Sequence, residues 1–309
     1  MALPAHTVQP ASPKAGARRD SRADSADVLA QRPAAMWIQT AFLFVLAVVF
    51  LIPLAWMLVT SVRPDAEITR GVVSWVPHPF TLENYKLILS DAQNPIGRWF
   101  FNSALVSVVA TALTLVVTSL AAYALSRLQF PGREAIFIVL LTSMLIPPVL
   151  LTIPLYNEFA NAIPNYSLID TYWPLILPYA SSVFGVFLLR QFYLQIPKEL
   201  DEAAMIDGAG KFRRWYKVIM PLSKSSMLTL GILTFMGVYN DYLGPLLFTT
   251  SATMRTVTVG IALVTLGSYT SNYGPLMAFS AIAALPVVVI FLLLQRYFIG
   301  SSTSSGVKG

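Results

Sequence analysis

The segment Glu199–Pro221 reads ELDEAAMIDGAGKFRRWYKVIMP, and it is the one long polar interruption between strongly apolar stretches in the C-terminal half of the chain. Pro197 suits the first turn of a helix, because the N–H group that it lacks would be unpaired there in any case. Lys198–Asp207 is therefore predicted to be helical, and Gly208 stands where a left-handed C-cap is favoured. We expect a short helix, a bend and a second helix.

The second helix is predicted to be amphipathic. Its apolar residues recur at i, i+3, i+4 and i+7 and share one face, which consists of Phe212, Trp215, Tyr216 and Ile219. Its basic residues fall largely on the other face: Lys211, Arg213, Arg214 and Lys217. We expect Phe212, Trp215 and Tyr216 to pack this segment against the rest of the chain. A solvated amphipathic loop on a membrane surface is the simpler alternative for the whole segment.

Composition places the chain in a membrane. Hydrophobic residues make up 56% and charged residues 12% of the 309 residues, with a mean hydropathy of +0.65, whereas a soluble domain carries about a quarter charged residues. Apolar stretches of bilayer-spanning length recur, so we expect an all-α polytopic membrane protein. The chain has no cysteine and two isolated histidines, His6 and His78, so no metal site or other cofactor is expected. The net charge of +6 gives no reason to invoke nucleic acid.

Six spans are predicted, and prolines in the first, third and fourth predict bent helices. The spans are expected near Trp37–Ser61, Phe101–Ser126, Glu134–Asn157, Thr171–Gln191, Leu222–Phe248 and Leu276–Gln295. They form one transmembrane domain over 34–299, with the polar loop at 192–221. Residues 1–33 are rich in Ala, Ser, Pro, Arg and Asp and lack periodicity, which predicts a disordered tail. Residues 300–309 form a second, C-terminal tail.

Lysine and arginine placement sets the orientation, because basic loops face the cytoplasm. With the N-terminus inside, only five basic residues lie outside: Arg63, Arg70, Lys86, Arg98 and Arg255. Both tails and Glu199–Pro221 are then cytoplasmic. The short inner turn Arg127–Arg133 carries an arginine at each end, for which anchoring at lipid headgroups is a sufficient explanation.

No catalytic constellation is found. Gly208-Ala209-Gly210-Lys211 is superficially similar to a phosphate-binding loop, but Met205 and Phe212 occupy the places that need Gly and Ser or Thr. Nucleotide binding by this chain is therefore not expected. The other polar feature is Tyr239-Asn240-Asp241 in the fifth span. An intramembrane carboxylate faces protein or water, so these three residues are candidates for lining a path through the membrane; the alternative is that Asp241 reaches the outer interface.

One spacing resembles a known family. Glu202-Ala203-Ala204, three residues, Gly208, nine residues, Val218, one residue and Met220-Pro221 is similar to the EAA loop of permease subunits of ATP-binding-cassette (ABC) importers, with Val218 and Met220 in place of Ile and Leu. Shorter elements from Trp37 to Gly309 also resemble the maltose-type carbohydrate permeases, specifically the smaller of two paired subunits. They are Phe80–Tyr85, Arg127–Arg133, Met144–Tyr156, Ile196–Leu200, Tyr273–Ala278, Gln295–Phe298 and Gly306–Gly309.

The resemblance implies a function for the polar loop. In this family the loop is a cytoplasmic coupling helix that docks on a separate ATPase, and the positions carried over are Glu202, Ala203, Ala204, Asp207, Gly208 and Pro221. It also implies the partners: a second homologous permease, two ATPase subunits that hydrolyse ATP, an extracytoplasmic solute-binding protein, a sugar or oligosaccharide, and the lipid of a bacterial or archaeal inner membrane.

Two other classes remain open from the residues alone. An ion-coupled secondary transporter would need ionisable groups near the bilayer midplane, and the predicted spans hold almost none. A structural or channel-forming subunit gives no reason for the long polar loop.

Overall fold

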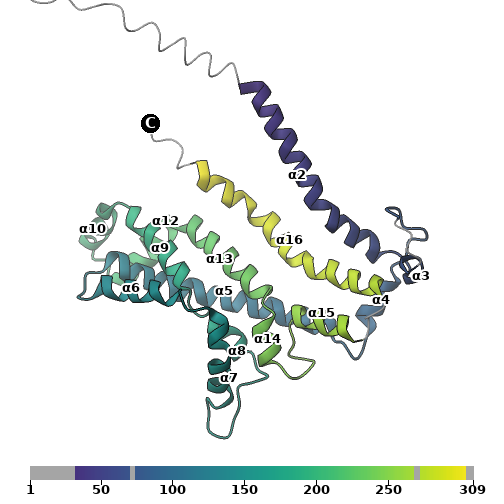
Figure 1. Cartoon of the computed structure of the whole chain (residues 1–309). Coiled ribbons are helices and arrows are strands. Elements are labelled where there is room, and N and C mark those ends of the chain that lie inside the picture. The colour runs from purple at the N-terminus through teal and green to yellow at the C-terminus, as the bar shows by residue number, and fades with distance from the viewer. Residues whose placement is uncertain (1–31, 70–73, 268–271, 304–309) are drawn as a thin grey trace, which may run out of the picture. The chain divides into compact units, whose positions relative to one another are not determined.

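The computed structural model describes residues 32–69, 74–267 and 272–303. Most of the predicted N-terminal tail and residues 304–309 of the predicted C-terminal tail lie outside the described residues. Within the described ranges the chain is built from helices without any strand (Figure 1). Residues 1–56 and 57–309 form separate units. The first holds most of helix α2 (Arg32–Ser61), which continues through Pro53.

Four described helical segments are long and apolar enough to cross a membrane, or six if each of two bent pairs counts as one span. The four are Met36–Ser61 in α2, Ile96–Arg127 (α5), Trp173–Gln195 and Tyr273–Leu293 in α16 (Tyr273–Thr303). Trp173–Gln195 is itself composed of α8 (Trp173–Ile176), the 3-10 turn η2 (Leu177–Tyr179) and α9 (Val183–Gln195). Helix α16 extends into the predicted C-terminal tail as far as Thr303.

The predicted third span is broken. Helix α6 (Arg133–Ser143) is followed by η1 (Pro148–Leu151) and α7 (Thr152–Ala160), and the two parts meet at 92°. Pro147 is extended, with φ −60° and ψ 127°, and neither Pro147 nor Pro148 has an N–H group to continue a helix. The bend that these prolines predicted is therefore confirmed, and it divides the predicted span Glu134–Asn157 into two helical parts.

The predicted fifth span also departs from one helix. Helix α13 (Lys224–Tyr239) ends before Asn240-Asp241, and α14 (Leu243–Phe248) follows. At its other end α13 meets Lys211–Leu222 at 83°. A further apolar helix, α15 (Val257–Leu266), was not predicted from the sequence.

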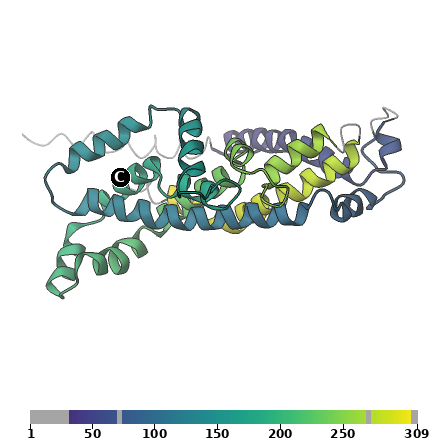
Figure 2. The ribbon, with the colours of Figure 1, turned by 90° about the horizontal axis from the view of Figure 1, so that it is seen from below.

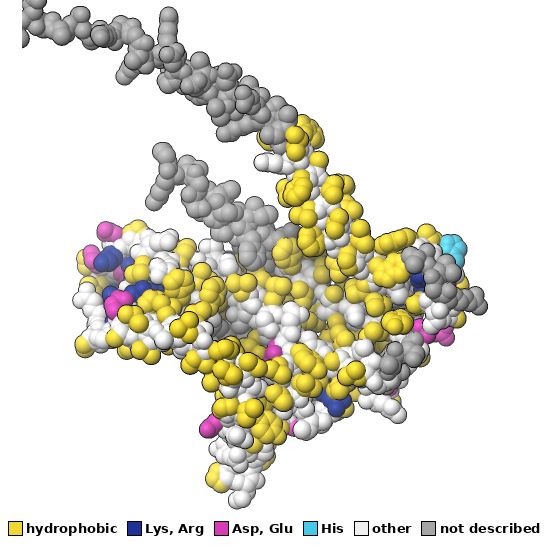
Figure 3. Space-filling view, in the orientation of Figure 1, with side chains coloured by type: hydrophobic (Ala, Val, Ile, Leu, Met, Phe, Trp, Pro, Cys, Tyr) yellow, Lys and Arg dark blue, Asp and Glu magenta, His cyan; other side chains and the backbone are white. Residues whose placement is uncertain are grey.

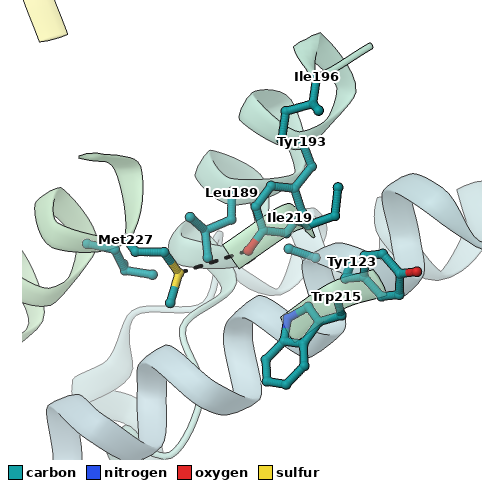
Figure 4. Close-up of a cluster of buried hydrophobic side chains, with 9 residues drawn as sticks. Tyr123, Leu189, Tyr193, Ile196, Trp215, Ile219 and Met227 are labelled. Carbon is teal, nitrogen blue, oxygen red and sulfur yellow. Dashed lines mark hydrogen bonds between the residues drawn. The ribbon is translucent and has the colours of Figure 1, made fainter. Parts of the chain in front are cut away.

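Helix α5 is the centre of residues 57–309, and α9 and α13 pack along it (Figures 1 and 2). Gly185 of α9 allows the close approach: a Cβ there would lie 2.8 Å from Thr118 of α5 and 2.9 Å from Leu230 of α13. The main apolar cluster lies where these helices meet the polar loop (Figure 4), and it contains Ala122, Tyr123, Leu189, Tyr193, Ile196, Trp215, Ile219, Met227 and Leu230.

The buried face of α5 also carries small polar residues, and they satisfy backbone groups that broken helices leave open. Thr114 Oγ1 donates to the carbonyl of Tyr179, and Thr118 Oγ1 accepts a hydrogen bond from the Ser182 N–H at 3.1 Å. Both partners lie where Pro174 and Pro178 interrupt the helix. Backbone polar groups inside a membrane need such internal partners. These two threonines therefore stabilise the irregular backbone between α8 and α9.

Near the N-terminal end of α5, two sequence elements that resembled the permease family contact each other. Asn84 of α4 (Glu83–Ser90) donates hydrogen bonds to the carbonyls of Ser61 at 2.9 Å and Arg63 at 2.8 Å. A Cβ on Gly274, at the start of α16, would lie 2.7 Å from the Asn84 amide. Phe80–Tyr85 and Tyr273–Ala278 therefore form one contact.

Candidate functional site

The polar loop has the predicted helix–bend–helix form. It consists of α10 (Lys198–Ile206), α11 (Lys211–Arg214), the π-helical turn η3 (Trp215–Ile219) and α12 (Met220–Leu222). Gly208 has φ +77°, in the left-handed region, and its N–H donates to the Met205 carbonyl at 3.0 Å. The left-handed Gly208 between two helices was thus predictable from the sequence.

Most of the coupling candidates are exposed. Ala204 is half-buried, and the others are solvent-accessible: Glu202, Ala203, Asp207, Gly208 and Pro221. Apolar side chains accompany them, with exposed fractions of 86% for Ile206 and 56% for Met205. Figure 3 shows acidic and basic side chains gathered at the end of the molecule that carries α10. Apolar side chains exposed among charges are typical of an interaction surface.

The structure corrects the expected packing face. Trp215 and Ile219 are buried in the main apolar cluster (Figure 4), whereas Phe212 is 67% and Tyr216 is 59% exposed. The buried stripe is narrower than predicted: Trp215 and Ile219, four residues apart and at the two ends of the π-helical turn, are the residues of the predicted face that reach the cluster. Phe212 instead lies against Trp215, with ring centroids 5.0 Å apart.

Arg127, at the C-terminal end of α5, lies beneath the loop. Its side chain is 4% exposed, so the lipid-headgroup interpretation is wrong for this arginine. Its guanidinium donates to the carbonyls of Tyr193 and Ile196, where α9 ends, the second at 2.6 Å. It also faces the Asp201 carboxylate, with Nε 3.9 Å from Oδ2. Arg214 faces the same carboxylate, with Nη1 3.9 Å from Oδ1.

A second arginine fastens the same end of the bundle. Arg190 of α9 donates two hydrogen bonds of 2.8 Å to the Glu134 carboxylate and one of 3.1 Å to the Leu125 carbonyl. Its guanidinium carbon lies 4.0 Å from the centre of the Phe137 ring. Arg190 and Arg127 therefore join the ends of α5, α6 and α9 beneath the polar loop.

Asp241 borders a cavity of about 290 Å³. The lining is mostly apolar and comes from η1, α7, the α8–η2 segment and α14, including Pro148, Leu155, Pro174, Pro178, Pro245 and Phe248. Tyr179, which also lines it, donates a hydrogen bond of 2.7 Å to Asp241 Oδ2. In the part of the chain that the structure describes, Asp241 forms no ion pair.

The other two path candidates do not line this cavity. Tyr239 is buried, and its hydroxyl donates to the Ala283 carbonyl at 3.0 Å. Asn240 is exposed and donates to the Met236 carbonyl. Tyr179 is the polar residue that sequence reasoning missed. Its signal was weak, because a tyrosine one residue after Pro178 marks an irregular backbone without indicating where the side chain points.

Residues 114–301 match a family described as "Binding-protein-dependent transport system inner membrane component". The match covers more than half of the chain. The chain belongs to this family.

Curated permeases match over most of the same length. This permease is 34% identical to the arabinooligosaccharides transport system permease protein AraQ of Halalkalibacterium halodurans over 279 residues, which cover 90% of this chain and 98% of the relative. It is 35% identical to the trehalose/maltose transport system permease protein MalG of Thermococcus litoralis, over 85% of this chain and 94% of the relative.

The fold also has a counterpart among solved structures. A chain of a bacterial ABC transporter involved in the import of the acidic polysaccharide alginate aligns with a TM-score of 0.75, 20% identity and coverage of 87% of the permease and 98% of that chain. The permease is thus a multi-pass inner-membrane component of a binding-protein-dependent transport system, and not an enzyme.

Proposed function

We propose that this permease is one of two paired permease subunits of an ATP-driven importer, and that it forms half of the translocation path for a sugar or oligosaccharide. Two ATPase subunits and an extracytoplasmic solute-binding protein complete the machine. The names of the relatives support a carbohydrate, since they specify arabinooligosaccharides, trehalose or maltose, and diacetylchitobiose.

The observation that carries the proposal is the surface of the polar loop. Helix α10 exposes Glu202 and Ala203, followed by Met205 and Ile206, while the adjoining turn is fixed in the core by Trp215 and Ile219. Exposed apolar and acidic groups on a helix next to a buried turn suit a groove on another protein. Burial of the apolar side chains supplies affinity, and complementary charges fix the relative position of the two surfaces.

The loop receives the force that switches the transporter between its two states. ATP closes the ATPase subunits against it on the cytoplasmic side, and the push reaches α5, α9 and α13 through the apolar cluster beneath Trp215. The bundle then changes the side from which the path is open. The ATPase must interact differently with the two states, since equal affinity for both shifts nothing.

The path is proposed to include the Asp241 cavity. The Asp241 carboxylate and the Tyr179 hydroxyl lie together against an apolar wall. An ionised carboxylate accepts hydrogen bonds from sugar hydroxyl groups, and a tyrosine hydroxyl can both donate and accept them. Asp241 is therefore proposed to contact solute during passage, whereas Tyr239 supports the helix behind it.

Purification of the tagged chain from its native membrane tests the assignment. We expect an ABC-type ATPase and a second permease to co-purify. Glu202→Lys should leave membrane insertion intact and reduce the amount of ATPase recovered. Glu199→Lys is the matched control, because Glu199 is an exposed carboxylate on the same helix outside the EAA positions.

The result that would overturn the proposal is equally defined. Recovery of the chain without an ATPase, together with uptake driven by an ion gradient in vesicles containing only this chain, would make it a secondary transporter. Equal loss of ATPase from both lysine variants would show that charge on α10 matters in general and that Glu202 has no specific role.

A further inference from the structure

Helix α10 has an unusual attachment to the molecule. Its one buried residue is charged: Asp201 is 7% exposed, while the apolar residues Leu200, Met205 and Ile206 are 44%, 56% and 86% exposed. Amphipathic helices are normally held by an apolar stripe. Here no such stripe faces inward, so the orientation of α10 depends on what Asp201 contacts.

Asp201 lies between two arginines from different elements. Arg127 of α5 and Arg214 of α11 each approach one carboxylate oxygen at 3.9 Å, and their side chains are 4% and 15% exposed. These distances are longer than hydrogen bonds, so the contacts are charge–charge attraction. Arg127 is itself fixed by the carbonyls of Tyr193 and Ile196. A continuous series of contacts thus runs from the end of α9 through Arg127 and Asp201 to Arg214.

The charges in this cluster are not interchangeable. Two guanidinium groups and one carboxylate give it one excess positive charge. Without Asp201, the largely buried guanidinium groups of Arg127 and Arg214 would lose their shared counter-charge, and an unpaired buried charge is strongly unfavourable. The hydroxyl of Tyr123 and the indole N–H of Trp215 are also buried without a hydrogen-bond partner among the described residues, and as neutral groups they supply no counter-charge.

We infer that Asp201 is a positioning residue that fixes helix α10 to α5 through Arg127 and Arg214, and so sets the direction in which a force on Glu202 acts on the bundle. This inference rests on the proposed coupling function. Asp201 and Glu202 are neighbours with different roles: Asp201 points its charge inward at the arginines, and Glu202 presents its charge outward to a partner.

Because the sequence has no cysteine, labels can be attached at chosen positions to measure the distance between α10 and the end of α5. Spin labels on Gln129→Cys, in the turn after α5, and on Lys198→Cys, the first residue of α10, occupy exposed positions on these two segments. In the assembled, detergent-purified complex we expect a narrow distribution of label distances. Asp201→Asn should broaden it. Asp201→Glu, which keeps the charge, and Glu199→Gln, which removes an exposed carboxylate from the same helix, should leave it narrow.

A second-site change separates positioning from general damage to the fold. Asp201→Asn leaves two positive charges without a counter-charge, and adding Arg214→Gln returns the cluster to one excess positive charge, as in the unaltered chain. The double variant lacks the repulsion between the two guanidinium groups and should therefore recover a narrower distribution than Asp201→Asn alone. If Asp201→Asn fails to assemble, the double variant is the test in its place. A distribution that stays narrow in Asp201→Asn, or a double variant no better than the single one, overturns the inference.

A functional measurement needs no knowledge of the solute. Leu243→Cys lines the Asp241 cavity, and its rate of reaction with a membrane-impermeant maleimide reports whether the cavity is open. In the unaltered background we expect a non-hydrolysable ATP analogue to change this rate several-fold. In Asp201→Asn the ratio of rates with and without analogue should fall to about one, although the analogue still binds the complex.

The outcomes distinguish the two proposals. No effect of the analogue in the unaltered background contradicts the proposed function, and with it this inference. A normal analogue effect in Asp201→Asn, despite a broadened label distance, leaves the proposed function intact and overturns the positioning role alone.

Discussion

The hydroxyl of Tyr179 donates a hydrogen bond to Oδ2 of Asp241 at 2.7 Å, joining the segment after Pro178 to the junction between α13 and α14. The Asp241 carbonyl in turn accepts from Thr258 Oγ1 of α15 at 2.6 Å. The side chain of Asp241 is therefore held by η2, 62 residues earlier in the chain, and its backbone by α15, 17 residues later. Both contacts lie where helices are interrupted, and the interruption is what allows the carboxylate to border a cavity.

Asp241→Asn should lower solute uptake while leaving ATPase co-purification unchanged. The amide keeps the size of the side chain but loses the charge, and a hydrogen bond to a charged group is worth about 1.5–3 kcal/mol, so we expect uptake to fall by roughly tenfold or more. Tyr179→Phe should have a smaller effect in the same direction. The initial uptake rate in reconstituted vesicles measures both, and loss of the ATPase from either variant would contradict the assignment.

Gly208→Ala should weaken coupling through backbone strain alone. Gly208 has φ +77°, and a Cβ there would have no neighbour within 4 Å, so the cost is conformational and about 1–2 kcal/mol. Gly210→Ala is the matched control, since Gly210 has φ −64° and equally open surroundings. ATPase activity per solute imported should rise for Gly208→Ala and stay unchanged for Gly210→Ala. Equal behaviour of the two would show that the left-handed turn is not required.

Gly260→Ala should destabilise the packing of α15 against α5. A Cβ at this position would lie 2.1 Å from Cε3 of Trp99, whose ring is fully buried and bonded to the Ala252 carbonyl. Overpacking of this kind costs about 1–3 kcal/mol or more, so the melting temperature in detergent should fall. Gly237→Ala, with no neighbour within 4 Å, should leave it unchanged or slightly raised. A normal melting temperature for Gly260→Ala would contradict the close packing of α15 on α5.

The stability of the loop after α14 should depend on pH through the carboxyl group of Asp170. Burial by itself raises the pKa of the Asp170 carboxyl, but hydrogen bonds from the backbone N–H groups of Ser251 and Thr250, both at 2.9 Å, outweigh it and hold the pKa below its ordinary value of 3.8. The stabilisation is therefore complete above pH 3.8 and is lost as pH falls through the lower folded-state pKa. Asp170→Asn should lose it at neutral pH.

Hydrogen exchange at the Thr250 and Ser251 amides measures this effect. Exchange should be faster in Asp170→Asn than in the unaltered chain at neutral pH, and the difference should shrink below pH 3.8. Glu158→Gln, which neutralises an exposed carboxylate on α7, should exchange like the unaltered chain throughout. A difference that persists undiminished into acid would show that the carboxylate charge is not responsible.

Local rules predicted the features that depend on neighbouring residues. Gly208 is left-handed because a helix C-terminus needs a residue that tolerates positive φ, and the bend at Pro147-Pro148 follows from two missing N–H groups. The long apolar helices were found because burial in lipid needs only length and hydrophobicity.

Features that depend on distant partners were missed. Arg127 was predicted to lie at lipid headgroups. Its hydrogen-bond acceptors, the carbonyls of Tyr193 and Ile196, are 66 and 69 residues away in sequence, so the neighbouring residues give no sign of them. Phe212 and Tyr216 were assigned to the buried face because a 3.6-residue pattern shows which residues share a face, but not how much of that face a neighbouring helix covers. No role was predicted for Asp201, because its two arginine partners come from separate elements and the sequence does not show that they lie beside it.

The contact between Asn84 and Gly274 has an evolutionary consequence. The Asn84 amide fills the space that a side chain at 274 would need, and it is held there by the carbonyls of Ser61, the last residue of α2, and of Arg63, just after it. The two positions should therefore be inherited as a pair. Homologues that carry alanine or serine at 274 should carry a smaller residue at 84, and a compensating change at one position should follow substitution at the other.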